Sequence, residues 1–269
     1  MNKEEAWVLG YLLSDGCLNP SSRNPYLSFI CQYNDREIMY KVKNILQTSA
    51  QVREYPHYKS PQARLAVYDR KDIVIDYNNI KEQIPVANIC GYERHFIRGL
   101  IDGDGTLSYR ESRKSFRLGF VDQVQSITQW VADTICNELM LPLKHARWSQ
   151  QNNLWELMWE GNVARLIAWW LYHGTVQHCS LQRKLDKYRT VVLNNQSFTD
   201  RNDELLQSVN AYYDNNGEIA FITPGNQTLA WCQRLQRLLT FNTAPVFHNK
   251  GKRKYYHLYI PATNTQDIN

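Results

Sequence analysis

The sequence predicts an α+β protein built from two repeated units, each with the element order α-β-β-α-β-β-α. The run VLGYLLSDG at 8–16 recurs as IRGLIDGDG at 97–105, with glycine, leucine and a final Asp-Gly at matching positions. Strand-like and helix-like segments then follow in the same order after each run. Because self-similarity within a chain is the signature of repeated structural units, we expect two pseudo-symmetric units of one fold.

Each unit opens with a helix, because the repeated runs are apolar and stop at Asp-Gly, a strong turn signal. The segments 26–31 and 116–121 follow, and their β-branched and aromatic residues predict strands. Apolar residues at three- and four-residue spacing predict amphipathic helices at 36–46 and 126–139. The remaining predicted elements are strands at 51–55, 63–68, 143–148 and 154–159 and closing helices at 70–80 and 162–172.

The C-terminal tail resembles part of a third unit. The segment that starts at Glu218 has the pattern of a strand followed by a helix, and 254–261 has the pattern of a strand. A polar, turn-prone run at 195–203 separates this βαββ-like segment from the second unit. We therefore predict three parts of the chain, at 1–92, 93–194 and 195–269.

Composition favours a soluble protein with a polyanionic partner. The chain of 269 residues is 43% hydrophobic, which is enough for a substantial core, and it carries a formal net charge of +5. Its 17 Tyr and 8 Trp add to the basic balance as features of nucleic-acid-binding surfaces. The 6 Cys are scattered without a C-x-x-C pair, so we expect reduced thiols in a cytoplasm-like bacterial, phage or organellar compartment.

Several classes of protein and site are excluded. His173, His178 and Cys179 form the one cluster of soft ligands, and no matching pair completes a tetrahedral zinc site. No run approaches the ~18 apolar residues of a membrane span. The N-terminal WVLGYLL is preceded by Glu4 and Glu5, so we expect no signal peptide.

The repeat separates the two acids of IRGLIDGDG. Asp104 aligns with Asp15, whereas Asp102 aligns with Leu13, so one acid persists in both copies. An EF-hand reading of the run fails, because the twelfth position of that loop would be Arg113 instead of a glutamate. We therefore expect Asp15 and Asp104 to be functional and Asp102 to be structural.

Small residues predict that the two motif helices touch. Gly10 and Ser14 in the first helix, and Gly99 and Gly103 in the second, lie four apart and therefore on one helix face. Small residues on facing helices allow close backbone approach. The two acids would then meet at helix C-termini, where the helix dipoles disfavour negative charge. A divalent cation such as Mg²⁺ would offset that repulsion, and carboxylate-bound divalent ions commonly hydrolyse phosphodiesters.

The two runs resemble the paired motifs of the LAGLIDADG homing endonucleases, and the stretch RHFIRGLIDGDGTL is especially close. The resemblance covers residues 6 to about 193 and is to the monomeric members, which carry two motifs in one chain. It implies saddle-shaped antiparallel sheets, a central interface of motif helices, and a metal-dependent double-strand break in a long double-stranded DNA target. It also implies that Asp15 and Asp104 are the catalytic acids and share two or three Mg²⁺ ions.

The resemblance further implies a basic residue and a water-organising polar residue beside each acid. Lys184, with Arg183 as its rival, is the predicted basic group, and Arg94 is a further candidate. Gln32 and Gln123 follow matching strands and are the predicted solvent-organising residues. The predicted DNA contacts are strand and hairpin residues, namely Arg53, Tyr55, Tyr58, Arg64, Tyr68, Arg110, Arg113, Lys114, Arg117, Lys144, Arg147, Trp148, Gln151, Lys252 and Arg253.

Two alternatives stay open beside the homing endonuclease. One is a scaffold that has lost the nuclease activity, either a maturase that assists the splicing of intron RNA or a DNA-binding regulator. The other is the endonuclease domain of an intein, but the chain starts with Met1 and no splicing block is visible. We therefore expect a free-standing protein, encoded in an intron or as an isolated mobile gene.

Overall fold

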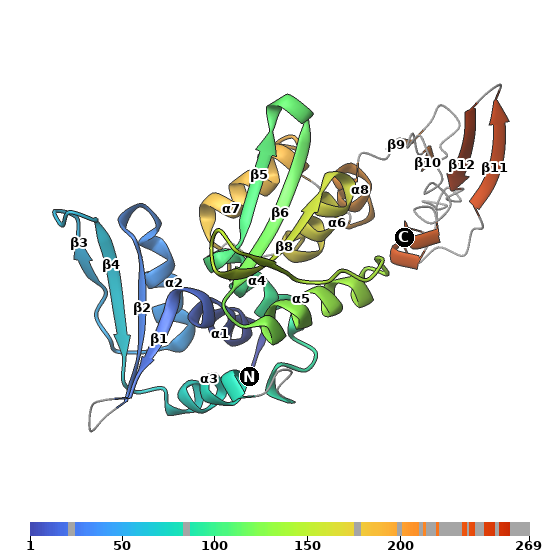
Figure 1. Cartoon of the computed structure of the whole chain (residues 1–269). Coiled ribbons are helices and arrows are strands. Elements are labelled where there is room, and N and C mark those ends of the chain that lie inside the picture. Colours follow the sequence, from blue (N-terminus) through green and yellow to red (C-terminus); the bar gives the residue numbers. More distant parts are fainter. Residues whose placement is uncertain are drawn as a thin grey trace, which may run out of the picture.

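The computed structural model confirms the α+β fold class, with two units that each carry a four-stranded antiparallel sheet (Figure 1). It describes residues 1–20, 25–82, 87–174, 179–197, 201–209, 212–213, 219–220, 233–235, 237–239, 245–250 and 253–258. The two motif helices lie at the centre, with the first sheet on one side and the second sheet on the other.

The first unit has the predicted order of elements. They are α1 (Lys3–Asp15), β1 (Gly16–Asn19), β2 (Tyr26–Gln32), α2 (Glu37–Leu46), β3 (Arg53–Tyr55), β4 (Gln62–Val67) and α3 (Lys71–Glu82). The sheet order is β1-β2-β4-β3, and every neighbouring pair is antiparallel. A 3-10 turn at Tyr33–Asp35 leads from β2 into α2.

The second unit repeats this order. Its elements are α4 (Glu93–Asp104), β5 (Thr106–Arg110), β6 (Ser115–Asp122), α5 (Gln125–Glu138), β7 (Arg147–Ser149), β8 (Leu154–Glu160) and α6 (Gly161–Tyr172), with 3-10 turns at Ala87–Ile89 and Glu111–Arg113. The sheet order, β5-β6-β8-β7, is that of the first unit. The predicted helices and strands of both units overlap the observed ones, and their ends differ by a few residues.

The C-terminal region begins with helices and ends in a third sheet. It contains α7 (Gln182–Lys187), a π-helical turn (Tyr188–Val192), α8 (Arg201–Ser208), β9 (Tyr212–Tyr213), β10 (Ile219–Ala220), β11 (Pro245–Lys250) and β12 (Arg253–Leu258). The strand order is β11-β12-β10-β9. The strand predicted at 254–261 corresponds to β12, whereas most of the segment from Glu218 to the predicted helix lies outside the described residues.

Strand alternation gives each main sheet one covered face and one open face. On β2, Leu27, Phe29 and Cys31 are buried, and on β4, Ala63 and Leu65 are buried beside them. Successive side chains of a strand point to opposite faces, so the residues between them lie on the other side of the sheet. The second sheet follows the same rule, with Phe116, Leu118, Phe120, Leu157 and Trp159 buried. Helices cover the buried faces, which leaves the opposite faces open.

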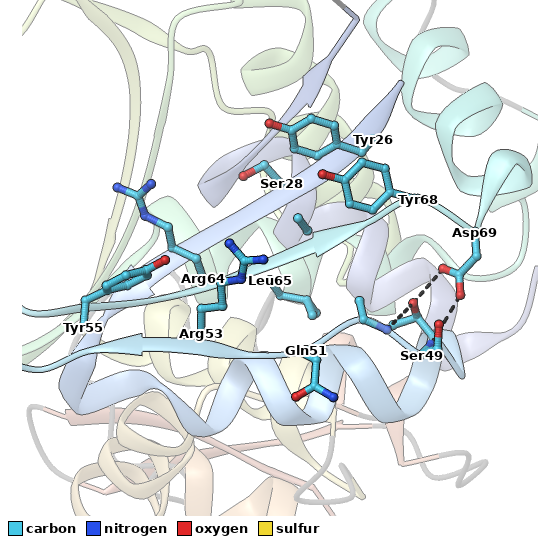
Figure 2. Close-up of a pocket in the computed structure, with 13 residues that line it drawn as sticks. Tyr26, Ser28, Ser49, Gln51, Arg53, Tyr55, Arg64, Leu65, Tyr68 and Asp69 are labelled. Atoms are coloured by element: carbon cyan, nitrogen blue, oxygen red, sulfur yellow. Dashed lines mark hydrogen bonds between the residues drawn. The ribbon is translucent and has the colours of Figure 1, made fainter. Parts of the chain in front are cut away.

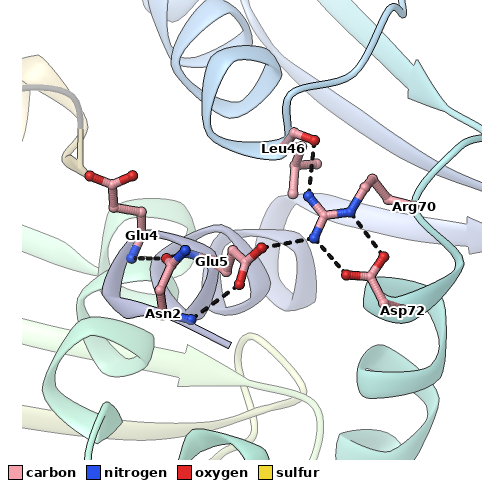
Figure 3. Close-up of polar contacts among 6 residues, drawn as sticks. All are labelled: Asn2, Glu4, Glu5, Leu46, Arg70 and Asp72. Atoms are coloured by element: carbon pink, nitrogen blue, oxygen red, sulfur yellow. Dashed lines mark hydrogen bonds and ion pairs between the residues drawn. The ribbon is translucent and has the colours of Figure 1, made fainter.

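Arg70 ties three helices of the first unit together (Figure 3). Its guanidinium lies 2.8 Å from the Glu5 carboxylate in α1 and 2.6 Å from that of Asp72 in α3, and it donates to the Leu46 carbonyl at the end of α2. Glu5 is fixed in turn, because it forms a capping box with Asn2 at the start of α1. Such a box satisfies backbone N–H groups that have no partner within the helix.

Two chemical features accompany the fold. The described cysteines Cys17, Cys31, Cys90, Cys136 and Cys179 all carry free thiols. Among the described residues, none of the helices has the length and apolar character required to cross a membrane.

Candidate active site

The two motif helices touch through their backbones. A Cβ atom added to Gly10 would lie 2.0 Å from the Phe96 carbonyl oxygen in α4, and one added to Gly99 would lie 2.1 Å from the Trp7 carbonyl oxygen in α1. Real Cβ atoms never come so close to backbone atoms, so neither helix has room for a side chain at these positions. The spacing of small residues thus brings α1 and α4 together as the sequence predicts.

The same contact brings the helix C-termini together. A Cβ on Gly103 would lie 1.9 Å from Ser14 Oγ and 3.4 Å from Asp15 Cγ, so the end of α1 lies against the end of α4. Asp15 and Asp104 are the last residues of these helices. Carboxylates that are distant in sequence therefore share one small region, at the ends where helix dipoles oppose negative charge.

The Asp15 carboxylate lies in a partly buried position. Burial raises its pKa above the ordinary range, and the charge of Asp35 adds to this effect. A hydrogen bond from the Tyr11 hydroxyl and the positive charges of Lys184 and Arg183 act in the opposite direction. Tyr11 lies one helical turn before Asp15 and is fully buried, so it holds the carboxylate in a fixed orientation.

Asp104 is more exposed, and its pKa is nonetheless raised to about 6. Partial loss of water around the carboxylate is the main cause, and the charges of Asp15 and Asp122 add to it. Lys184 opposes the shift. The ionised form of this acid is thus disfavoured by its own surroundings, which is the property expected of a group that awaits a cation.

Asp102 has a structural position, as its alignment with Leu13 predicts. Its side chain is fully buried and accepts hydrogen bonds from Trp7 Nε1 at 2.8 Å, the Tyr172 hydroxyl at 2.7 Å and the Leu181 N–H at 3.1 Å. These donors come from α1, α6 and the start of α7. The carboxylate therefore joins three distant segments behind the site, and buried charges require such partners.

Lys184 does not have the predicted role of a phosphate ligand. Its side chain is buried, and its ammonium donates to the carbonyls of Ile101, Asp102 at 2.8 Å, Gly103 at 3.2 Å and Gly105 at 2.7 Å. The carbonyls of Ile101, Asp102 and Gly103 belong to the last turn of α4, and the negative end of a helix attracts a positive charge. The Ile101 carbonyl also accepts the Gly105 N–H. Lys184 is a positioning residue for Asp104, because its donors are directed at the helix end.

Replacing Lys184 by Met is expected to lower the free energy of unfolding by about 2–4 kcal/mol, because it leaves buried carbonyls unpaired next to Asp102. Urea denaturation followed by far-UV circular dichroism measures this loss. Lys187 lies in the same helix and is exposed, so Lys187→Met should change stability by less than about 0.5 kcal/mol. Equal effects of the two substitutions would show that Lys184 does not cap the helix.

Arg183, the rival candidate, is placed closer to the predicted role. Its Nε lies 2.9 Å from the Asp35 carboxylate, and its side chain remains 58% exposed. Its positive charge acts on Asp15. An exposed guanidinium beside the acids can contact a phosphate group, whereas the buried ammonium of Lys184 cannot.

The two predicted glutamines occupy different surroundings. Gln123 lines a cavity of about 580 Å³ together with Asp104, Asp122 and Ser14, so it shares this space with one of the acids. Gln32 ends β2 opposite Gln62 and is exposed. Gln123 is therefore placed beside Asp104 by this cavity.

The donor set fits a hard divalent cation held partly by other oxygens. In the described part of the chain, no group of three or more His, Cys, Asp and Glu side chains is arranged to hold a metal ion. Asp15 and Asp104 supply oxygen ligands, and burial disfavours the ionised form of each in spite of the nearby charge of Lys184. Mg²⁺ usually takes one or two carboxylates and completes its coordination with water and substrate phosphate oxygens. The residues present meet this pattern.

The first sheet carries a groove on its open face (Figure 2). The groove has a volume of about 450 Å³ and is lined by the predicted DNA-contacting residues Arg53, Tyr55, Arg64 and Tyr68. Two pairs of aromatic rings, Tyr26 with Tyr68 and Tyr55 with Tyr58, have centroids 4.7 Å apart. The sequence-predicted residues of the first unit therefore gather on one surface.

The second sheet gathers only part of its predicted set. Arg110, Arg113 and Lys114 lie in the β5–β6 hairpin, and Gln151 lies in the turn between β7 and β8. The prediction that Lys144 contacts DNA from a strand is wrong. Lys144 precedes β7, and its ammonium lies 5.8 Å from the centre of the Trp159 ring on the covered face. Of the other predicted contacts, Trp148 packs edge-on against Trp155. Lys252 lies outside the described residues, and Arg253 begins β12.

Three neighbours of the acids escaped the sequence interpretation. Tyr11 is four residues before Asp15, a spacing that places both on one helix face, and this signal was available. Asp122 is adjacent to the predicted Gln123, and its importance follows only from the strand register. Asp35 lies in the 3-10 turn after β2, and its charge raises the pKa of Asp15. No pattern in the sequence indicates this proximity. Arg94, the further basic candidate, instead donates to the His173 carbonyl.

His173 has a packing role. Its ring stacks on Trp169 with centroids 4.5 Å apart, and burial lowers its pKa to about 3. His178 lies outside the described residues.

No protein-family model matches the chain, and no curated protein gives a significant match. Among solved structures, the chain is similar to full-length DUF199/WhiA from Thermatoga maritima, with 16% identity and a TM-score of 0.47. That match covers 75% of this chain and 64% of the other, so the chain spans less than two thirds of that protein.

Two homing endonucleases are also similar. The LAGLIDADG homing endonuclease I-GzeII, in complex with its DNA target, gives 9% identity and a TM-score of 0.43, and the match covers 76% of this chain and 96% of that one. I-DmoI, in complex with DNA and Mn, gives 17% identity and a TM-score of 0.41, with 58% and 88% covered. The structural neighbours thus include LAGLIDADG homing endonucleases and WhiA, and the roles of the site residues rest on the geometry of this chain.

Proposed function

We propose that this protein is a site-specific DNA endonuclease that makes a divalent-metal-dependent double-strand break. The observation that carries the proposal is the meeting of Asp15 and Asp104 at the touching C-termini of α1 and α4. Two carboxylates that repel one another, in a basic protein with two open sheet faces, are suited to bind cations and a polyanion together. The proposed cofactor is Mg²⁺, and the proposed partner is double-stranded DNA bound by a monomer.

The residues of the site divide the work of phosphodiester hydrolysis. Asp15 and Asp104 would hold the divalent ions, and a bound ion supplies Lewis-acid stabilisation of charge on the phosphate. Tyr11 orients the carboxylate of Asp15, while Lys184 fixes the end of the helix that carries Asp104. Arg183, whose exposed guanidinium pairs with Asp35, would contact a phosphate, and Gln123 would hydrogen-bond water in the cavity beside Asp104.

Cleavage-site mapping on a randomised duplex DNA library tests the proposal. The full chain is incubated with the library in Mg²⁺, and ends produced by cutting are captured and sequenced. We expect one long recognition sequence with both strands cut, and binding without cutting when Ca²⁺ replaces Mg²⁺. Binding of duplex DNA without cutting in any divalent metal would favour a regulator, and binding of intron RNA alone would favour a maturase.

Cleavage should depend on pH through Asp104. Since its pKa is raised to about 6 and the metal binds the ionised form, the rate at subsaturating Mg²⁺ should fall about tenfold per pH unit below pH 6. Asp122→Asn removes a charge that raises this pKa, so the fall should move to lower pH. Initial rates between pH 5 and 8 measure the effect, and an identical profile for Asp122→Asn would contradict this assignment.

The stability of the metal-free protein should decrease as pH rises, whereas the cleavage rate should increase. A folded pKa above that of the unfolded chain means that the folded state binds this proton more tightly, so stability is lost as pH rises from about 4 to 6. Because the carboxylate is exposed, the expected gain from Asp104→Asn at pH 7.5 is small, about 1–2 °C in Tm. Thermal melts at pH 4 and 7.5 measure it, and a gain at pH 4 as well would contradict the linkage.

A further inference from the structure

The open faces of the two main sheets differ in charge. On the first sheet, Arg53 and Arg64 are cross-strand partners in the β3–β4 register, and the Arg64 guanidinium lies 5.6 Å from the centre of the Tyr55 ring. Glu54 directly follows Arg53 in β3, so its side chain points to the other face of the sheet. There it accepts a hydrogen bond from the Tyr40 hydroxyl. This face therefore presents two arginines side by side.

The acid that lines the same groove is at its far end. Figure 2 shows Asp69 on the side away from Arg53 and Arg64, with its carboxylate accepting hydrogen bonds from Thr48 and Ser49. Its acceptor capacity is used by the loop that follows α2. The arginine pair thus remains available to a polyanion.

The second sheet presents acids on its open face. Glu156 and Glu160 alternate on β8 with the buried Leu157 and Trp159, so both glutamates point away from the core. Glu160 is the register partner of Arg117, and its carboxylate lies 2.7 Å from the guanidinium. The register likewise sets Glu156 opposite Arg147 on β7.

The consequence for a duplex is a division between the sheets. An arginine that contacts a phosphate releases a counterion and contributes affinity for any sequence. An arginine beside a glutamate contributes less, and the carboxylate repels phosphate oxygens. A glutamate facing a major groove can, however, accept a hydrogen bond from the amino group of cytosine. Acids on a DNA-facing surface therefore reduce affinity for wrong sequences more than for the right one.

We infer that the arginine pair of the first sheet supplies sequence-independent affinity for duplex DNA, while Glu156 and Glu160 make the second sheet a specificity-determining surface. This inference rests on the proposed binding of duplex DNA. Arg117 and Arg147, predicted as DNA contacts, act in it as partners of these glutamates. The remaining cations of the second unit, at the β5–β6 hairpin, are left for its phosphate contacts.

The test uses the full chain with Asp15→Asn and Asp104→Asn, so that binding is measured without cutting. The dissociation constant for a duplex selected from a random library, and for a scrambled duplex of equal length, is determined between 0.05 and about 0.3 M KCl. Arg53→Gln with Arg64→Gln should weaken both duplexes by about tenfold. It should also lower the salt slope by about 2, since two phosphate contacts are lost.

The double substitution Glu156→Gln with Glu160→Gln should change affinity for the scrambled duplex in the opposite direction. It should tighten binding of the scrambled duplex by about tenfold and leave the selected duplex unchanged or weaker, so the ratio of the two affinities falls. Glu156→Gln alone keeps the Arg117–Glu160 ion pair and should give part of the effect. Glu54→Gln removes the same charge from the covered side of the first sheet and should leave the ratio unchanged.

An unchanged ratio in the glutamate variants, or weaker binding of the scrambled duplex, would overturn the inference while leaving the proposed function intact. Equal salt slopes for the arginine variant and its parent would overturn the part assigned to the first sheet. A parent that binds no duplex would overturn both the inference and the proposed function.

Discussion

Asp15→Asn and Asp104→Asn are each expected to reduce double-strand cleavage by more than about 10³-fold. Asparagine keeps the size of the side chain, so the packing of α1 on α4 is preserved. It removes the charge that would hold the divalent ion, and under the proposed function the cut in each strand would depend on one of the two acids. Conversion of supercoiled plasmid carrying the selected target to linear and nicked forms measures the loss of each cut separately.

The matched control is Asp186→Asn. Asp186 is an exposed acid in α7 that accepts a hydrogen bond from Gln182. Its substitution therefore removes the same charge without changing either acid at the ends of α1 and α4. Its cleavage rate should stay within about twofold of the parent. Affinity for the duplex in Ca²⁺ should be similar in all three variants. A normal cleavage rate for Asp15→Asn or Asp104→Asn would show that the substituted acid is not required for catalysis.

Gly99→Ala is expected to destabilise the fold by more than about 3 kcal/mol, although alanine normally stabilises a helix by ~1 kcal/mol. The added methyl group would meet the Trp7 carbonyl oxygen and, at 2.7 Å, the Tyr11 amide nitrogen. Both are backbone atoms, so no rotamer change relieves the clash, and the helices must move apart. Urea denaturation measures the effect, which is a large share of the 5–15 kcal/mol typical of a folded protein.

Ser14→Ala serves as the control in the same interface. It adds no atom, and within the described residues the serine hydroxyl donates to carbonyls of its own helix, those of Gly10 and Tyr11. Its effect should stay below about 1 kcal/mol. A Gly99→Ala protein as stable as the parent would mean that the two helices do not touch through their backbones.

The order of elements was predictable because both units obey simple periodic patterns. In β2 alternate residues are buried, and α2 and α5 bury one face each, so local composition marks this strand and these helices. The contact of α1 with α4 was also predictable, since Gly10, Ser14, Gly99 and Gly103 form a pattern that requires close approach. These features depend on residues near one another in sequence.

The surroundings of the acids were less predictable because they depend on tertiary contacts. The resemblance implies that Lys184 is the basic group beside the acids, but nothing local indicates that its ammonium caps α4. The neutralisation of Arg117 by Glu160 follows from a strand register that composition does not fix. Lys144 falls within the strand predicted at 143–148, but β7 begins only at Arg147. Its ammonium instead lies against the Trp159 ring on the covered face.

The capping of α4 connects the site to the order in which the chain is synthesised. Asp15 and Asp104 leave the ribosome long before Tyr172, Leu181 and Lys184, which hold Asp102 and the end of α4. A nascent or truncated chain that ends before these residues carries both acids without the contacts that fix the second one. The arrangement of the site is therefore completed only when the second unit is nearly finished, so incomplete translation products lack the ordered pair of carboxylates.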